Sequence, residues 1–184
     1  SMKPLTKMAR QIVSPRSIGT IVRDAFRVAQ QERPGPVLLE LPEDVAGYEV
    51  GDVPIVPRHP IDWPVAHPDA ILRAAKMIRN AKRPLIMIGA AGNRPRLVAE
   101  LSRFVQRTGI PFFTTQMGKG AVTGCSEHYM GTTALSAGDY VHRAVDHADL
   151  IVSIGHDTIE KPPFLMTPGR HQVVHIGFVP ATVE

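Results

Sequence analysis

The sequence contains a single cysteine, Cys125, among its 184 residues. One thiol excludes a disulfide framework and a zinc cluster built on cysteines, and it is typical of a reducing compartment, so we predict a cytoplasmic protein. Long apolar runs are absent as well: none approaches the roughly 20 residues of a membrane-spanning helix, and the N-terminus leads into no apolar signal segment. We therefore expect neither a membrane span nor a secretion signal.

Clusters of positive charge are also lacking. The 21 lysines and arginines stand against 17 acidic residues, for a formal net charge of +4, and they are scattered singly rather than interleaved with aromatic residues, which make up 5% of the chain. A nucleic-acid surface needs a basic run or patch. We predict no nucleic-acid partner.

Histidines are more frequent, but their spacing does not suit a metal. There are eight, and none belongs to a His-Glu-x-x-His motif. His171 and His175 would lie roughly 13 Å apart along one strand. His142 and His147 would point about 140° away from each other on a helix. The sequence therefore predicts no metal site.

A cysteine nucleophile needs a nearby base and a third group that orients the base. His128 follows Cys125 in the same loop, but the sequence offers no visible orienting partner. We interpret Cys125 as an inert loop residue and predict no catalytic residue in this chain.

Proline is the unusual abundance, with 17 residues. Five of them fall in about fifteen residues that show no helical or strand periodicity: Pro54, Pro57, Pro60, Pro64 and Pro68. Such a segment is extended and fairly stiff. We predict a linker at residues 51–67, between an N-terminal piece at residues 1–50 and a C-terminal piece at residues 68–184.

The N-terminal piece shows one helix and one strand. Ser14 or Ser17 can begin the helix, whose apolar residues recur at steps of three and four, and residues 37–41 form a short apolar strand. One helix and one strand cannot form a core, so we interpret residues 1–50 as the end of another α/β domain. The large apolar residues of the helix would then need cover from the C-terminal piece or from a second copy: Ile18, Ile21, Val22, Phe26 and Val28.

The C-terminal piece alternates strands and helices. Amphipathic helices are expected at residues 68–80, 95–107 and 138–147, and short apolar strands at residues 85–88, 110–114, 150–154 and 172–176. This alternation is typical of a parallel sheet with helices on both faces. We predict an α/β, Rossmann-like fold, preceded by the helix and strand of the other domain.

Three loops after these strands have a composition suited to ligands, because parallel sheets bind ligands at the carboxyl ends of their strands. They are residues 89–92 (GAAG), 114–120 (TTQMGKG) and 155–157 (GHD). None has the G-x-G-x-x-G spacing of a dinucleotide site or the spacing of a P-loop. Their small residues could equally serve tight turns.

Several stretches, taken together, resemble thiamine-diphosphate enzymes. Residues 33–45 (RPGPVLLELPEDV), with the helix before them, resemble the end of the pyrimidine-binding domain of that family. The central domain of that family is similar to residues 83–89 (RPLIMIG), 114–120 with 127–131 (EHYMG), 148–155 (ADLIVSIG) and 174–176 (VHI) with Pro180 and Ala181. Residues 155–164 (GHDTIEKPPF) carry a finer likeness to the large, catalytic subunit of acetolactate synthases.

This resemblance implies an oligomeric enzyme that condenses 2-oxo acids with thiamine diphosphate and magnesium. The family places its catalytic glutamate early in the first domain and its Gly-Asp-Gly…Asn magnesium motif in the third, and neither occurs here. We therefore expect a fragment, incomplete at the C-terminal end of the central domain, that holds neither cofactor. Two alternatives are another decarboxylase or carboligase of the family, and a free-standing nucleotide-binding module.

The resemblance also allows FAD, which anabolic acetolactate synthases hold in the central domain. The corresponding residues are Gly89, Ala90, Ala91, Thr114, Thr115, Gln116, Met117, Gly118, Gly131, Thr132, Gly155, His156 and Asp157. The arginine-rich Arg-Phe-Asp-Asp-Arg segment of the family is replaced here by residues 156–161 (HDTIEK). Losing those arginines removes bidentate donors to a pyrophosphate, which argues against FAD.

Overall fold

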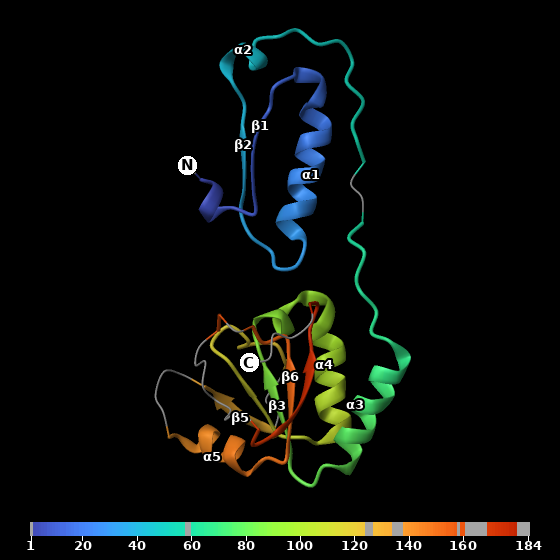
Figure 1. Ribbon diagram of the computed structural model, residues 1–184, viewed down its shortest axis with the longest axis vertical. Coiled ribbons are helices and arrows are strands. Elements are labelled where there is room, and N and C mark those ends of the chain that lie inside the picture. The colour runs from blue at the N-terminus through green and yellow to red at the C-terminus, as the bar shows by residue number, and fades with distance from the viewer. Residues whose placement is uncertain are drawn as a thin grey trace. The chain divides into compact units, whose positions relative to one another are not determined.

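A computed structural model describes residues 2–57, 60–123, 127–133, 138–157, 159–160 and 169–179. The chain divides into two compact units, Ser1–Pro64 and Val65–Glu184, called here the first and the second unit (Figure 1). No helix or strand occurs in the described residues between positions 46 and 68. The boundaries expected at residues 50 and 67 remain a prediction.

The first unit is a strand–helix–strand motif. Strand β1 (Met8–Gln11) pairs in parallel with β2 (Val37–Glu40), and α1 (Ile18–Gln30) connects them, followed by the short helix α2 (Glu43–Ala46). Two 3-10 turns lie at Lys3–Leu5 and Pro15–Ser17. The expected helix and second strand are present, whereas β1 was not predicted because its sequence, Met-Ala-Arg-Gln, lacks apolar alternation.

The first unit also has a small core of its own. Ile12, Ile21 and Val45 are buried together, with Ile18 and Leu39 packed against them. The expectation that Ile21 lacks cover within this segment was therefore wrong. Ile12, which follows β1, and Val45, which lies in the short helix α2, cover Ile21. Neither β1 nor α2 was predicted from the sequence. Phe26, by contrast, is 59% exposed.

The second unit contains a five-stranded parallel sheet in the order β5-β4-β3-β6-β7. Its elements are α3 (Pro68–Asn80), β3 (Pro84–Ile88), the 3-10 turn η3 (Ala90–Asn93), α4 (Pro95–Thr108), β4 (Phe112–Thr114), β5 (Tyr129–Thr132), α5 (Tyr140–His147), β6 (Leu150–Ile154) and β7 (Gln172–Ile176). Strand β5 was not predicted, because its four residues, Tyr-Met-Gly-Thr, form neither an apolar run nor an apolar alternation.

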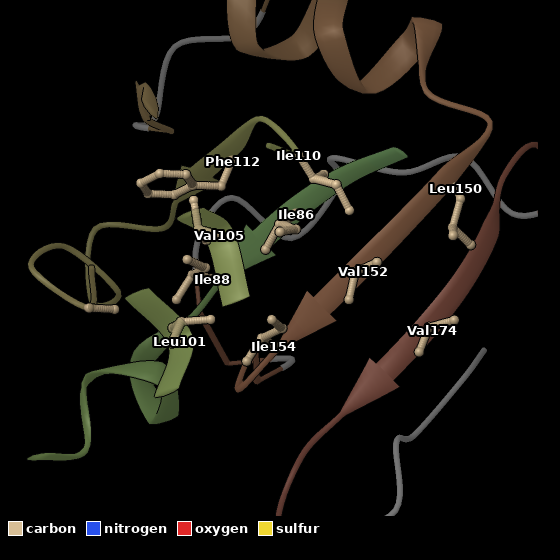
Figure 2. Close-up of a cluster of buried hydrophobic side chains, with 11 residues drawn as sticks. Ile86, Ile88, Leu101, Val105, Ile110, Phe112, Leu150, Val152, Ile154 and Val174 are labelled. Atoms are coloured by element: carbon tan, nitrogen blue, oxygen red, sulfur yellow. The ribbon is translucent and has the colours of Figure 1, made fainter. Parts of the chain in front are cut away.

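Side chains alternate between the two faces of this sheet, as strand geometry requires. Ile86 and Ile88 face α4, where they pack with Leu101 and Val105 (Figure 2). Leu85, Met87, Phe113 and Ile151 share the other cluster with Val141 and Val145 of α5. Figure 1 shows α3 and α4 on one face and α5 on the opposite face. The predicted α/β sheet covered on both faces is confirmed.

Helix α5 begins at a carboxylate cap. Asp139 Oδ1 accepts the backbone N–H groups of Val141 (2.9 Å) and His142 (3.0 Å), and it lies 2.8 Å from His142 Nδ1. The hydrogen bond with the His142 side chain is the main cause that holds the pKa of Asp139 below its usual value. The ionised carboxylate therefore contributes to the stability of this helix.

Asp139→Ala is expected to lower the free energy of unfolding of the second unit by about 1 kcal/mol at pH 7, because it removes an N-cap. Since the folded pKa is depressed, this contribution is complete above about pH 4 and is lost as pH falls through the folded pKa. Urea unfolding followed by circular dichroism measures both effects. Asp139→Ser is the control: it keeps a capping oxygen and should lose the pH dependence. Equal stability of Asp139→Ala and the parent chain at pH 7 would contradict the cap.

Candidate functional site

The loops after β3, β4 and β6 pack against one another at the carboxyl edge of the sheet. Backbone hydrogen bonds join them in series: Gly89 N–H donates to Ile154 O (2.8 Å), Thr115 N–H to Ile88 O (2.9 Å), and Ala91 N–H to Gly155 O (3.0 Å). We call residues 89–93, 115–121, 155–157 and Glu160 the loop cluster. It contains ten of the predicted site residues: Gly89, Ala90, Ala91, Thr115, Gln116, Met117, Gly118, Gly155, His156 and Asp157.

Glu160 ties these three loops with one carboxylate. Its Oε1 accepts the N–H groups of Ala90 (3.0 Å) and Asp157 (2.9 Å). Its Oε2 lies 3.0 Å from the same Ala90 nitrogen and accepts the Thr115 hydroxyl at 2.5 Å. The residue is 6% exposed. A buried carboxylate with donors from three loops is therefore the centre of the cluster.

Glycine is required where these loops meet. A Cβ at Gly89 would lie 2.4 Å from His156 Cα and 2.7 Å from Glu160 Oε1. A Cβ at Gly118 would lie 2.1 Å from Ile88 O. At both positions the missing side chain lets the chain pack on itself, rather than leaving room for a ligand.

Gln116 and Met117 are exposed members of the loop cluster, and Met117 O accepts a hydrogen bond from Asn93 Nδ2 (3.1 Å). The predicted residues outside the cluster are Thr114, Gly131 and Thr132. Gly131 and Thr132 belong to strand β5 rather than to a loop. The Thr132 hydroxyl lies 3.0 Å from that of Thr114 at the end of β4. Cys125, Lys161, Pro180 and Ala181 lie outside the described residues.

His156 is partly buried beside Glu160. Its Nε2 has no hydrogen-bond partner in the described part of the chain. Burial lowers the pKa of His156, and the nearby carboxylates of Glu160 and Asp157 only partly oppose this effect. Burial also lowers the pKa of His175, and His156 adds to that shift. Both histidines are therefore favoured in the neutral form.

This pattern predicts a loss of stability in acid. An unfolded histidine titrates near pH 6.5, so below about that pH the unfolded chain binds more protons than the folded one. The free energy of unfolding should fall as pH drops through this value, and the loss should level off once the folded histidines are protonated. His156→Asn should reduce the dependence between about pH 7.5 and 5.5. The exposed His147, changed to Asn, is the control, and equal pH profiles for both variants would refute the assignment.

The structure adds two observations on other site classes. Among the described residues, no group of three or more histidines, cysteines or acidic residues could hold a metal ion. No helix in that part of the chain is long and apolar enough to cross a membrane.

Residues 71–184 match the family model described as the central domain of thiamine pyrophosphate enzymes. The chain belongs to this family. It is 30% identical over 188 residues to the acetolactate synthase large subunit of Parasynechococcus marenigrum, covering 98% of this chain and 30% of that protein. It is 34% identical over 155 residues to the acetolactate synthase large subunit of Corynebacterium glutamicum, covering 83% of this chain and 25% of that protein.

Solved structures agree on the fold. Benzoylformate decarboxylase from Polynucleobacter necessarius superposes with a TM-score of 0.80 at 21% identity, covering 97% of this chain and 34% of that one. At this identity the likeness shows the fold alone. The family-model match over residues 71–184 confirms the family resemblance predicted from sequence. The chain spans about 30% of the length of the acetolactate synthases it matches.

The loop cluster does not fit the pyrophosphate of FAD. Phosphate groups at the carboxyl edge of a parallel sheet are bound by free backbone N–H groups. Here the N–H groups of Gly89, Ala91 and Gly155 bond to carbonyl oxygens, and those of Ala90 and Asp157 bond to Glu160. These five donors are in use, and the acceptor of two of them is a carboxylate.

Glu160 was missed by the sequence analysis. In the sequence, residues 156–161 differ from the family most visibly by the arginines that they lack. An acidic residue three positions after Asp157, in a loop that follows a fully buried strand, was the available signal. Its burial depends on contacts with two loops 45 and 70 residues away, which local sequence does not reveal.

Proposed function

We propose that this chain supplies the central domain, and part of the preceding domain, of an enzyme that condenses 2-oxo acids as acetolactate synthases do. The observation that carries the proposal is the 30% identity to an acetolactate synthase large subunit over 98% of the chain, which includes the first unit.

In this proposal the central domain is a rigid scaffold. Its sheet is packed on both faces, and the loops at its carboxyl edge bond to one another through Glu160. Thiamine diphosphate, when bound, supplies the carbanion chemistry. In a whole protein similar to the relatives, residues outside this chain would hold it together with magnesium. We also propose a homo-oligomer and, from the single cysteine, a cytoplasmic location.

The alternative of a free-standing nucleotide-binding module has less support. Such a module needs available phosphate donors at the carboxyl edge of its sheet, whereas the N–H groups of Gly89, Ala90, Ala91, Gly155 and Asp157 already bond to oxygens of this chain. The alternative of another decarboxylase or carboligase of the family is an outcome of the following test.

The test uses the whole protein with thiamine diphosphate, magnesium and ¹³C-labelled pyruvate, followed by NMR. Two pyruvates should give acetolactate and carbon dioxide, and a reaction without thiamine diphosphate is the control. Acetaldehyde with no acetolactate would favour a decarboxylase, and no product from any 2-oxo acid would overturn both enzyme proposals.

The 184-residue chain alone is expected to bind no thiamine diphosphate and to turn over no pyruvate. The reason is that its sequence contains neither the family's catalytic glutamate segment nor its Gly-Asp-Gly…Asn magnesium motif, which would anchor the diphosphate. Calorimetric titration with thiamine diphosphate and magnesium tests this, with the whole protein as the positive control. A dissociation constant in the micromolar range for the isolated chain would contradict the prediction.

A further inference from the structure

We propose that Glu160 closes the loop cluster to anionic nucleotides, because its carboxylate takes the place and the donors that a phosphate group would use. Glu160 lies at the edge of a parallel sheet where three loops meet, which is where ligand phosphates bind in folds of this class.

The geometry is that of an anion held by its own chain. Ala90 N–H lies 3.0 Å from both carboxylate oxygens, Asp157 N–H lies 2.9 Å from Oε1, and the Thr115 hydroxyl donates to Oε2. These are two backbone amides and one hydroxyl converging on a planar anion. A bound phosphate would have to displace the carboxylate to reach them.

Close packing around the Glu160 carboxylate also opposes the binding of a second anion. Glu160 Oε1 lies 2.7 Å from the position of a Cβ at Gly89, so the carboxylate rests directly on the backbone of the first loop. The Thr115 hydroxyl also accepts from Gly118 N–H at 3.1 Å, which fixes the second loop in the same arrangement. A phosphate bonded to the same donors would therefore overlap the carboxylate.

Charge adds to this exclusion. Glu160 is 6% exposed, so solvent screens its carboxylate poorly against any negative group brought beside it. The loss of arginines noted in the sequence removes donors to a pyrophosphate, and no substitution of Glu160 restores them. A buried carboxylate opposes every phosphate ligand, including inorganic pyrophosphate, and this difference makes the proposal testable.

Two variants distinguish the effect of the Glu160 charge from the effect of the space that its side chain fills. In Glu160→Gln the amide oxygen can still accept from Ala90 and Asp157, and its NH₂ can donate to the Thr115 hydroxyl, so the loops stay joined without the charge. Glu160→Ala removes the side chain and frees all three donors. Glu127→Gln is the matched control, because it removes one carboxylate that is 86% exposed in the same unit, before the amino end of β5.

The experiment titrates the 184-residue chain with FAD, followed by flavin fluorescence, and with inorganic pyrophosphate, followed by calorimetry. The parent chain and Glu127→Gln should show no saturation up to about 1 mM. Glu160→Ala should bind pyrophosphate at least about tenfold more tightly than the parent, with Glu160→Gln between them. Circular dichroism checks that each variant is folded.

A parent chain that binds FAD or pyrophosphate with micromolar affinity would overturn the proposal, and so would a folded Glu160→Ala that binds no better than the parent. If Glu160→Ala does not fold, Glu160→Gln decides by the same comparison. The titrations use no thiamine diphosphate and no 2-oxo acid. Their outcome is therefore independent of the proposed condensation activity.

Discussion

Phe113→Ala should lower the free energy of unfolding of the second unit by about 3–5 kcal/mol, the usual cost of emptying a large buried aromatic site. Phe113 is fully buried on β4, the strand next to the centre of the sheet. It packs in the cluster that joins the sheet to α5, with Met87 and Val145 among its members. The cavity cannot collapse easily, because strands and helix enclose it.

Urea unfolding followed by circular dichroism measures this loss. Fluorescence is a poor choice, since the single tryptophan, Trp63, belongs to the first unit. Phe26→Ala is the control: the same change at a side chain that is 59% exposed should alter stability by less than about 0.5 kcal/mol. Similar losses for both variants would show that the two-sided core is described wrongly.

Gly118→Ala should cost about 3 kcal/mol, at the upper end of what overpacking produces. The added Cβ would lie 2.1 Å from Ile88 O and 2.8 Å from Ile88 C. Both are backbone atoms of β3, so no side-chain rotation relieves the clash. The loop after β4 would have to move away from the strand, which also breaks the Thr115 N–H bond to Ile88 O.

The matched control is Gly177→Ala in the same unit. Among the residues that the structure describes, its Cβ would meet nothing nearer than Val179 O at 3.4 Å, which is an ordinary contact. Thermal unfolding followed by circular dichroism should show a clear decrease for Gly118→Ala and almost none for Gly177→Ala. Equal unfolding temperatures would mean that this loop does not lie against β3.

Much of the second unit follows from its sequence, because local and tertiary preferences agree there. Pro68 fixes the first turn of α3, which begins at that residue and ends at Asn80 as predicted. Gly109 ends α4 in the left-handed conformation, with φ of 63°, as its position after the apolar pattern predicts. Strand β3 is apolar throughout, and β6 is apolar except for Ser153, because both faces of these strands are covered.

The short strands β1 and β5 could not be predicted in the same way. Each has four residues, and neither has an apolar run that stands out from a loop. Their partners define them: β1 pairs with β2, and β5 pairs with β4 across a shift in register. Pairing of this kind joins segments up to 29 positions apart and leaves no local signal.

The sequence predicted where the candidate site lies, but it did not predict which groups form it. Composition pointed to the loops at residues 89–92, 114–120 and 155–157, which the structure brings together. It did not show that a carboxylate from residue 160 would satisfy their donors. A buried acid and a surface acid look the same in a single sequence, and only the tertiary contacts distinguish them.

The most direct test of the account is a titration of the ¹⁵N-labelled chain with FAD, observed at single amides by NMR. We predict no shift changes at Ala90, Thr115 or Asp157, together with slow hydrogen exchange at Ala90, because Glu160 already holds its N–H. Saturable shifts at these three amides, with rapid exchange of the Ala90 N–H before FAD is added, would contradict a loop cluster closed by its own carboxylate.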